Sequence, residues 1–282
     1  SRSIHLPIPK ILVIYTGGTI GMMIKNKVYT PKVGFLEEAL RKLVILNDPS
    51  TVSFDREKYD PECKYLYLPT GTSADSVAYY ILEYDELLDS SCMSVEHYCT
   101  IANDIKENYE YFSGFVILHG TDTMAYTASY LSFMLENLSK PVILTGSQIP
   151  IFETRSDARD NLIGALMLSG IFNIPEVTLY FNTKLLRGNR SVKTDSQGFH
   201  AFESPNCQPI ATVDYNINVR WDLVQQSPEP GNNFNVFTKM DSNVGLFRIF
   251  PGASGDMLRS FCKSGIKGIV LQTYGMGNVP IN

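Results

Sequence analysis

The segment that decides the fold is Lys10-Ile-Leu-Val-Ile-Tyr-Thr-Gly-Gly-Thr19. It begins with a continuous run of apolar, mostly β-branched residues and ends with a glycine pair followed by a hydroxyl. Such a run predicts a strand that is buried on both faces, as the strands of a parallel sheet are. The glycine pair predicts a tight turn directly after the strand, where the main chain can approach a neighbouring group closely.

Similar apolar runs recur along the chain and alternate with stretches in which apolar residues have helical spacing. The strand-like runs are 115–119, 141–145 and 177–181, and the helical stretches are 94–105, 122–138 and 156–166. Regular alternation of strands and helices predicts an α/β fold, with a doubly wound and mostly parallel sheet.

Changes in composition and in apolar pattern along the chain predict three regions. Residues 1–205 form the N-terminal domain that carries the strand-end threonines. Residues 206–243 contain several prolines and a Gly-Asn-Asn stretch, which predicts a linker. Residues 244–282 begin a smaller α/β C-terminal domain. We expect that domain to be incomplete here, because two strands and one helix cannot enclose a core of their own.

Composition excludes several classes of protein. The net charge is -5 with no long run of Lys or Arg, so nucleic acid is not an expected partner. No apolar stretch reaches about 18 residues, so no membrane segment is expected. Five widely spaced cysteines without a Cys-x-x-Cys pair, and four histidines without metal spacing, argue against disulfides and metals. The same cysteine usage fits a reducing, cytoplasmic compartment.

Hydroxyl groups beside glycines at three strand ends, those of Thr19, Thr121 and Ser147, are the first candidates for chemistry, because ligands of parallel sheets gather at the carboxyl ends of the strands. Thr19 follows one glycine turn and Thr121 follows another. Two interpretations stay open at each: Thr19 can satisfy its turn or face a ligand, and Asp122 can cap a helix as well as join a ligand site.

A threonine hydroxyl becomes nucleophilic only with a base in hydrogen-bond reach, for which a neutral lysine or a carboxylate could serve. Lys193 is the candidate amine, and the alternative is an ordinary lysine on a solvated basic loop. Asp89 and Ser90 form either a polar turn before the next helix or a pair that holds a substrate's ammonium and carboxylate groups. The phosphate-loop, dinucleotide and Gly-x-Ser-x-Gly motifs are absent from the sequence.

Two segments resemble the signatures of the L-asparaginase family: Tyr15-Thr-Gly-Gly-Thr-Ile-Gly-Met22 and His119-Gly-Thr-Asp-Thr-Met-Ala-Tyr126. The sequence is similar to the cytoplasmic, type I branch, which includes animal asparaginases that also carry the name lysophospholipase. The resemblance implies hydrolysis of L-asparagine to L-aspartate and ammonia through an acyl-enzyme. It also implies a homodimer or homotetramer that uses neither a metal nor an organic cofactor.

The resemblance further implies a role for each matching residue. Thr19 resembles the nucleophile, Tyr29 resembles a tyrosine on the mobile lid above it, and Lys193 resembles the lysine of the activating group. The expected catalytic residues are Thr19, Thr121, Asp122, Lys193 and Tyr29, and the expected substrate-binding residues are Asp89, Ser90, Gly18 and Gly120.

Two departures from the family's pattern and two alternative functions accompany this interpretation. Cys92 stands where many relatives carry an aspartate, and residues 48–72 look like an insertion. One alternative is a glutaminase-asparaginase of broader specificity, because a single methylene is discriminated by only about 1–3 kcal/mol. The other is a module that senses asparagine without hydrolysing it. A lysophospholipase activity has no Gly-x-Ser-x-Gly motif in its favour.

Overall fold

The computed structural model describes residues 8–52, 54–69 and 76–280. The chain divides into two compact units, Ser1–Thr238 and Lys239–Asn282. Strands of the first unit are β1 (Lys10–Gly17), β2 (Met23–Lys25), β3 (Val28–Thr30), β4 (Leu66–Leu68), β5 (Val77–Leu88), β6 (Gly114–Leu118), β7 (Leu135–Glu136), β8 (Val142–Thr145), β9 (Val177–Phe181), β10 (Lys184–Arg187), β11 (Val192–Lys193), β12 (Phe202–Glu203), β13 (Ala211–Val213), β14 (Ile217–Val219) and β15 (Asn235–Val236). Its helices are α1 (Phe35–Lys42), α2 (Arg56–Tyr59), α3 (Val95–Asn108), α4 (Met124–Met134) and α5 (Ala158–Ile171), with 3-10 turns η1 (Thr19–Gly21), η2 (Pro49–Thr51), η3 (Ser90–Cys92) and η4 (Gly188–Arg190).

Nine strands of the described chain form the main sheet, in the order β14-β13-β10-β9-β8-β6-β1-β5-β4. The five central strands, from β9 to β5, run parallel to one another. Antiparallel pairing is confined to the two sides, where β4 joins β5 and β10, β13 and β14 follow β9. The prediction of an α/β fold with a mostly parallel sheet is confirmed.

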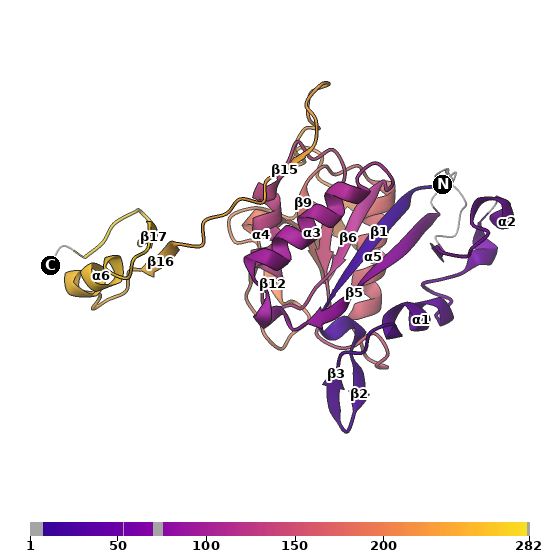
Figure 1. The fold of residues 1–282 in the computed structure, drawn as a ribbon, viewed down its shortest axis with the longest axis horizontal. Helices are drawn as coiled ribbons and strands as arrows, with labels where there is room; N and C mark the ends of the chain where they lie inside the picture. The colour runs from indigo at the N-terminus through magenta and orange to yellow at the C-terminus, as the bar shows by residue number, and fades with distance from the viewer. Residues whose placement is uncertain (1–7, 53, 70–75, 281–282) are drawn as a thin grey trace. The chain divides into compact units, whose positions relative to one another are not determined.

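Helices cover both faces of this sheet, as a doubly wound fold requires (Figure 1). On one face, Val13 of β1 and Val116 of β6 belong to a buried cluster with Leu40 of α1 and Leu162 of α5. On the other face, the Phe115 ring stacks on Tyr109 at the end of α3, with ring centroids 6.1 Å apart. Burial of apolar side chains on both faces explains why the central strands have no polar alternation in the sequence.

Strand β1 positions the region of interest. All eight of its residues are buried, so its register and direction are fixed by neighbours on both edges. Its pairing with β5 shifts between Tyr15 and Gly17, and the strand leaves the ladder there. Gly17 and Gly18 then adopt positive φ angles of 127° and 86°, a conformation that glycine accepts without strain.

The predicted linker, 206–243, differs from the structure. It contributes β13 and β14 to one side of the main sheet, and β15 pairs with β7. These strands are two or three residues long and mostly half-exposed or exposed, so they carry little of the apolar pattern by which strands are recognised. The first unit ends at residue 238.

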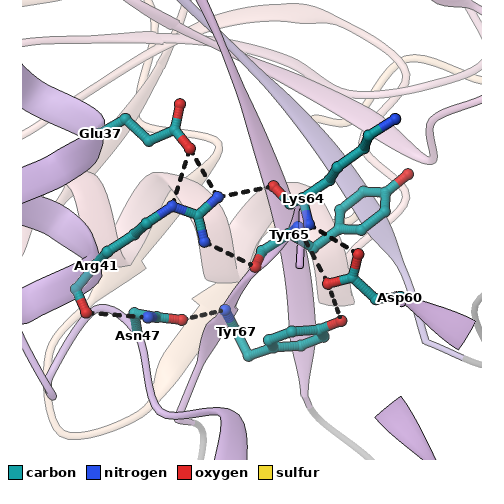
Figure 2. Close-up of polar contacts among 7 residues, drawn as sticks. All are labelled: Glu37, Arg41, Asn47, Asp60, Lys64, Tyr65 and Tyr67. Carbon is teal, nitrogen blue, oxygen red and sulfur yellow. Dashed lines mark hydrogen bonds and ion pairs between the residues drawn. The ribbon is translucent and has the colours of Figure 1, made fainter. Parts of the chain in front are cut away.

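Most of the predicted 48–72 insertion is described, although residues 53 and 70–72 lie outside the described part. Asp60 is buried and accepts hydrogen bonds from two main-chain N–H groups and from the Tyr67 hydroxyl, at 2.8, 3.2 and 2.9 Å. Arg41 of α1, paired with Glu37, donates to two carbonyls of the same segment, and Asn47 bridges Arg41 to Tyr67 (Figure 2). The segment is therefore folded against α1.

The second unit is a single βαβ element. It consists of β16 (Val244–Arg248), α6 (Gly255–Cys262) and β17 (Gly268–Gln272). The two strands pair in parallel, and Phe247 packs on Phe261 of the helix with ring centroids 5.3 Å apart. The predicted second, smaller α/β region is confirmed in these elements.

Candidate active site

Three turns meet at the carboxyl ends of the neighbouring strands β5, β1 and β6. Gly18 donates its main-chain N–H to the carbonyl of Leu88, at 3.2 Å. A Cβ atom on Gly18 would lie 2.5 Å from the nitrogen of Gly120, and a Cβ on Gly120 would lie 2.6 Å from Oγ of Ser90. The turns that carry the two strand-end threonines and Ser90 therefore touch through bare glycine main chain.

Thr19 is the first residue of η1, directly after Gly18, and it is half-buried. The turn is closed by a hydrogen bond from the Met22 N–H to the Thr19 carbonyl, at 3.0 Å. A second bond, from the Ile151 N–H to the Ile20 carbonyl at 3.0 Å, fixes η1 to the loop that follows β8. The main chain at Thr19 is therefore held from both sides of the turn.

Lys193 reaches the second strand-end threonine. Its Nζ donates to Thr121 Oγ1 at 2.9 Å and to Asp122 Oδ1 at 2.7 Å. The Lys193 side chain is 17% exposed, whereas the Asp122 side chain is 64% exposed. An ion pair that solvent reaches so freely contributes little to stability. Its structural effect is to hold the amine beside the hydroxyl, so Lys193 does not lie on a solvated loop.

Gln148 also contacts this hydroxyl, and no motif in the sequence predicts that contact. Thr121 Oγ1 donates to Gln148 Oε1 at 3.3 Å, and Gln148 Nε2 donates to the Gly198 carbonyl at 3.0 Å. The Gln148 N–H donates to the buried Asp157 at 3.0 Å. Only its position after a strand-end glycine could have drawn attention to it. The neighbouring Ser147 hydroxyl turns away and donates to a carbonyl within its own loop.

Asp89 and Ser90 occupy the turn after β5. Asp89 is exposed, and the Ser91 N–H donates to its carboxylate at 2.9 Å, which holds the pKa of that carboxyl below its ordinary value. Asp89 is therefore an anion at neutral pH. Ser90 is buried, and its carbonyl accepts a hydrogen bond from the Thr123 hydroxyl at 2.7 Å. The turn is thus tied to the Thr121 loop as well as to Gly120.

Tyr29 lies on the β2–β3 hairpin, which follows η1 along the chain. Asn26 and Lys27 form the two-residue turn with φ angles of 53° and 65°, the values that such hairpins require. The Tyr29 side chain is 43% exposed. Its expected place above Thr19 stays a prediction.

A cavity of about 630 Å³ lies beside the Lys193–Asp122 pair. Its walls come from Asp122, which precedes α4, from Tyr126 and Ser129 on α4, and from residues 191–196. Polar groups at the Lys193 end and an aromatic ring on α4 give it the mixed lining that is typical of small-molecule sites.

Within residues 8–52, 54–69 and 76–280, no group of three or more His, Cys, Asp or Glu side chains could hold a metal ion. All five cysteines fall in that part of the chain and are free thiols. None of the helices described there combines the length and the apolar character needed to cross a bilayer.

The fold and the site define a class of protein: an α/β chain with hydroxyl, amine and carboxylate groups gathered where parallel strands end, as in enzymes that use a hydroxyl nucleophile. The family model "Asparaginase, N-terminal" matches residues 10–225. The chain belongs to the asparaginase family.

Individual relatives agree with this assignment. The chain is 49% identical over 272 residues to an L-asparaginase of Dirofilaria immitis, covering 96% of this chain and 45% of that protein. It is 43% identical over 274 residues to the 60 kDa lysophospholipase of Homo sapiens, covering 97% and 47%. The crystal structure of L-asparaginase I from Vibrio cholerae superposes with a TM-score of 0.81 at 40% identity, covering 98% of this chain and 75% of that one. The chain thus spans about half the length of the first two relatives.

Proposed function

We propose that this chain hydrolyses the side-chain amide of L-asparagine to give L-aspartate and ammonia. The observation that carries the proposal is the Lys193 amine within hydrogen-bond distance of the Thr121 hydroxyl, at the strand edge where the Thr19 turn also lies. Nucleophilic amide hydrolysis needs a hydroxyl that attacks and a base that takes up its proton. Two threonine hydroxyls and an amine are available at this edge of the sheet. Membership in the asparaginase family supports the choice of substrate.

In the proposed mechanism, Thr19 Oγ1 attacks the amide carbonyl and forms a tetrahedral intermediate. The proton of the Thr19 hydroxyl passes through Thr121 to the Lys193–Asp122 pair, in which Asp122 orients the amine. Main-chain N–H groups of the glycine turns stabilise the oxyanion. The nitrogen is protonated and leaves as ammonia, which produces a Thr19 ester. Water then attacks that ester with the same base, and aspartate is released.

The turn at 89–90 is proposed to hold the rest of the substrate. The ionised Asp89 pairs with the substrate ammonium, and the Ser90 hydroxyl bonds its α-carboxylate, which orients the amide toward Thr19. Gly18 and Gly120 contact the substrate through their main chain. Tyr29 covers Thr19 when the β2–β3 hairpin closes over the bound molecule.

We further propose that the protein works in the cytoplasm as a homodimer or homotetramer, on a small molecule and without nucleic acid or membrane partners. Five free thiols support a reducing compartment. The proposed assembly rests on the resemblance to the family.

Ammonia release from L-asparagine and from L-glutamine, measured in a coupled assay, tests this function. We expect the unaltered chain to favour asparagine and Thr19→Ala to abolish release while the fold is retained. Thr100→Ala is the matched control, because Thr100 is an exposed threonine on α3. We expect it to behave like the unaltered chain.

Other outcomes point elsewhere. Survival of activity in Thr19→Ala would remove Thr19 as the nucleophile. Equal turnover of both amides would indicate a glutaminase-asparaginase. Binding of asparagine by calorimetry without any ammonia release would indicate a sensing module.

A further inference from the structure

His119 is the residue between the end of β6 and the Gly120-Thr121 turn, and the proposed mechanism does not use it. Its side chain is buried, with 1% exposed. Ring atom Nδ1 lies 2.7 Å from the Gly120 carbonyl oxygen, and Nε2 lies 2.8 Å from the hydroxyl of Thr127 on α4. Both ring nitrogens are therefore engaged, and neither is bonded to Thr121.

The two partners determine which nitrogen of the ring carries the proton. A carbonyl oxygen only accepts hydrogen bonds, so Nδ1 must be the donor toward Gly120. In the uncharged ring Nε2 is then an acceptor, and it takes the hydrogen of the Thr127 hydroxyl. That hydroxyl lies farther, at 3.3 Å, from its other acceptor, the Thr123 carbonyl.

The surroundings keep the ring uncharged. Burial lowers the pKa of His119 to about 4, and the hydrogen bond to the Gly120 carbonyl offsets that effect only in part. The phenol of Tyr98 on α3 is uncharged at neutral pH because burial raises its pKa further. An imidazolium without a carboxylate partner in such a site is strongly disfavoured.

Gly120 has no side chain that could restrict its own main-chain conformation. Glycine has access to conformations that other residues avoid, so its own stereochemistry does not fix the next peptide plane. That plane contains the Gly120 carbonyl and the Thr121 nitrogen, because the peptide bond is planar. A ring N–H that holds the carbonyl therefore sets the direction in which the chain enters Thr121.

We propose that His119 is a positioning residue of the active site: its Nδ1–H donates to the Gly120 carbonyl and orients the turn that presents Thr121 to Lys193. The inference rests on the proposed function for its effect on catalysis, whereas the hydrogen-bond assignment stands on geometry alone. It also excludes His119 from acting as the general base of a Thr-His-Asp arrangement, because both of its nitrogens point to other partners.

Three substitutions separate this role from simple packing. His119→Leu removes the donor and keeps most of the bulk. His119→Asn keeps an amide N–H near the position of Nδ1. Thr127→Val removes the hydroxyl from the far side of the ring and leaves the donor to Gly120 in place. Circular dichroism and thermal unfolding of each variant report on the fold.

We expect His119→Leu to lower kcat for asparagine by about 100-fold, the size of effect that a displacement near 1 Å produces. KM should change by no more than a few-fold, since Asp89 and Ser90 are untouched. His119→Asn should recover about tenfold of the loss, and Thr127→Val should lose much less than His119→Leu. The proposal would be overturned if His119→Asn or Thr127→Val lowered kcat as much as His119→Leu does.

A second measurement uses the unaltered protein, so it does not depend on any variant folding. Nitrogen-15 NMR of the histidine rings should find His119 with its proton on Nδ1 and none on Nε2 at neutral pH. A proton on Nε2, alone or on both nitrogens, would overturn the assignment. If the unaltered chain releases no ammonia, the proposed function fails, and this spectrum alone decides the His119 proposal.

Discussion

The amine of Lys193 lies 2.9 Å from the hydroxyl oxygen of Thr121, although the two residues are 72 positions apart in the sequence. Two different pieces of the fold produce this contact. Thr121 is fixed by the end of a central strand, whereas Lys193 arrives on the short strand β11, which pairs with β12 through Phe202. The contact therefore depends on the whole first unit being folded.

Replacing Lys193 with Met should lower ammonia release by about 10²–10⁴-fold, because a positioned base contributes that much. Lys184→Met is the matched control, since Lys184 is exposed at the start of β10. We expect it to retain full activity in the same coupled assay. A Lys193→Met variant within threefold of the unaltered chain would contradict the role of the amine.

Gly18→Ala should unfold or inactivate the chain more than its backbone conformation alone explains. Both Gly18 and Gly231 have positive φ angles, but a Cβ on Gly231 meets no atom within 4 Å. Gly231→Ala therefore reports the conformational cost by itself, about 1–2 kcal/mol. Gly18→Ala adds a clash at 2.5 Å from the Gly120 nitrogen, so activity should fall at least about tenfold further. Urea unfolding measures the loss of stability in each variant, and the ammonia assay measures the loss of activity. If Gly18→Ala and Gly231→Ala lost stability and activity to the same extent, contact between the two turns would be contradicted.

Asp60→Ala should destabilise the first unit by about 3 kcal/mol, because it leaves the Tyr67 hydroxyl and two main-chain N–H groups without their acceptor. Activity per folded molecule should be unchanged, since the hydrogen bonds from Arg41 hold this segment against α1. Glu57→Ala, at an exposed position of α2, is the control. Loss of activity without loss of stability would show that the segment serves the site directly.

The pH dependence of stability should carry a contribution from His119. Its folded pKa of about 4 lies below the ordinary value of 6.5, so between these values the unfolded chain binds the extra proton. The contribution of the uncharged ring to the free energy of unfolding is complete above pH 6.5. That contribution decreases by about 3 kcal/mol as the pH falls to 4. Urea unfolding of the unaltered chain and of His119→Asn, at pH 7 and at pH 4.5, measures this contribution. The carboxylates titrate equally in both proteins, so their effect cancels in the difference between the two unfolding free energies. If the difference in unfolding free energy between the two proteins were the same at both pH values, the lowered pKa of His119 would be contradicted.

The sequence predicts those parts of the fold whose residues are apolar throughout. Strands β1, β6, β8 and β9 are continuous buried runs and were expected. Strand β5 (Val77–Leu88) was not, because its second half carries Glu83, Asp85 and Glu86. Asp85 and Glu86 are exposed where the strand passes beyond its neighbour β4. The sequence predicts a linker where strands β13 and β14 lie, for the same physical reason: short, half-exposed strands show no apolar run.

For the candidate site, glycine turns at strand ends were informative because few other features require glycine next to a hydroxyl. They pointed to Thr19 and Thr121, and the need for a base pointed to Lys193. The partners that complete the arrangement, Gln148 and Thr123, lie near such turns, but neither directly follows the glycine. Their amide and hydroxyl groups become specific only when distant loops are brought within hydrogen-bond distance.

The contact between Gly18 and Gly120 limits how this scaffold can be redesigned. Neither position has space for even one methyl group, so the floor of the site offers no side chain with which to reshape a pocket. Laboratory evolution toward longer or bulkier amides should therefore leave the two glycines as they are and collect its changes among side chains that line the cavity, such as Tyr126, Ser129 and Val192.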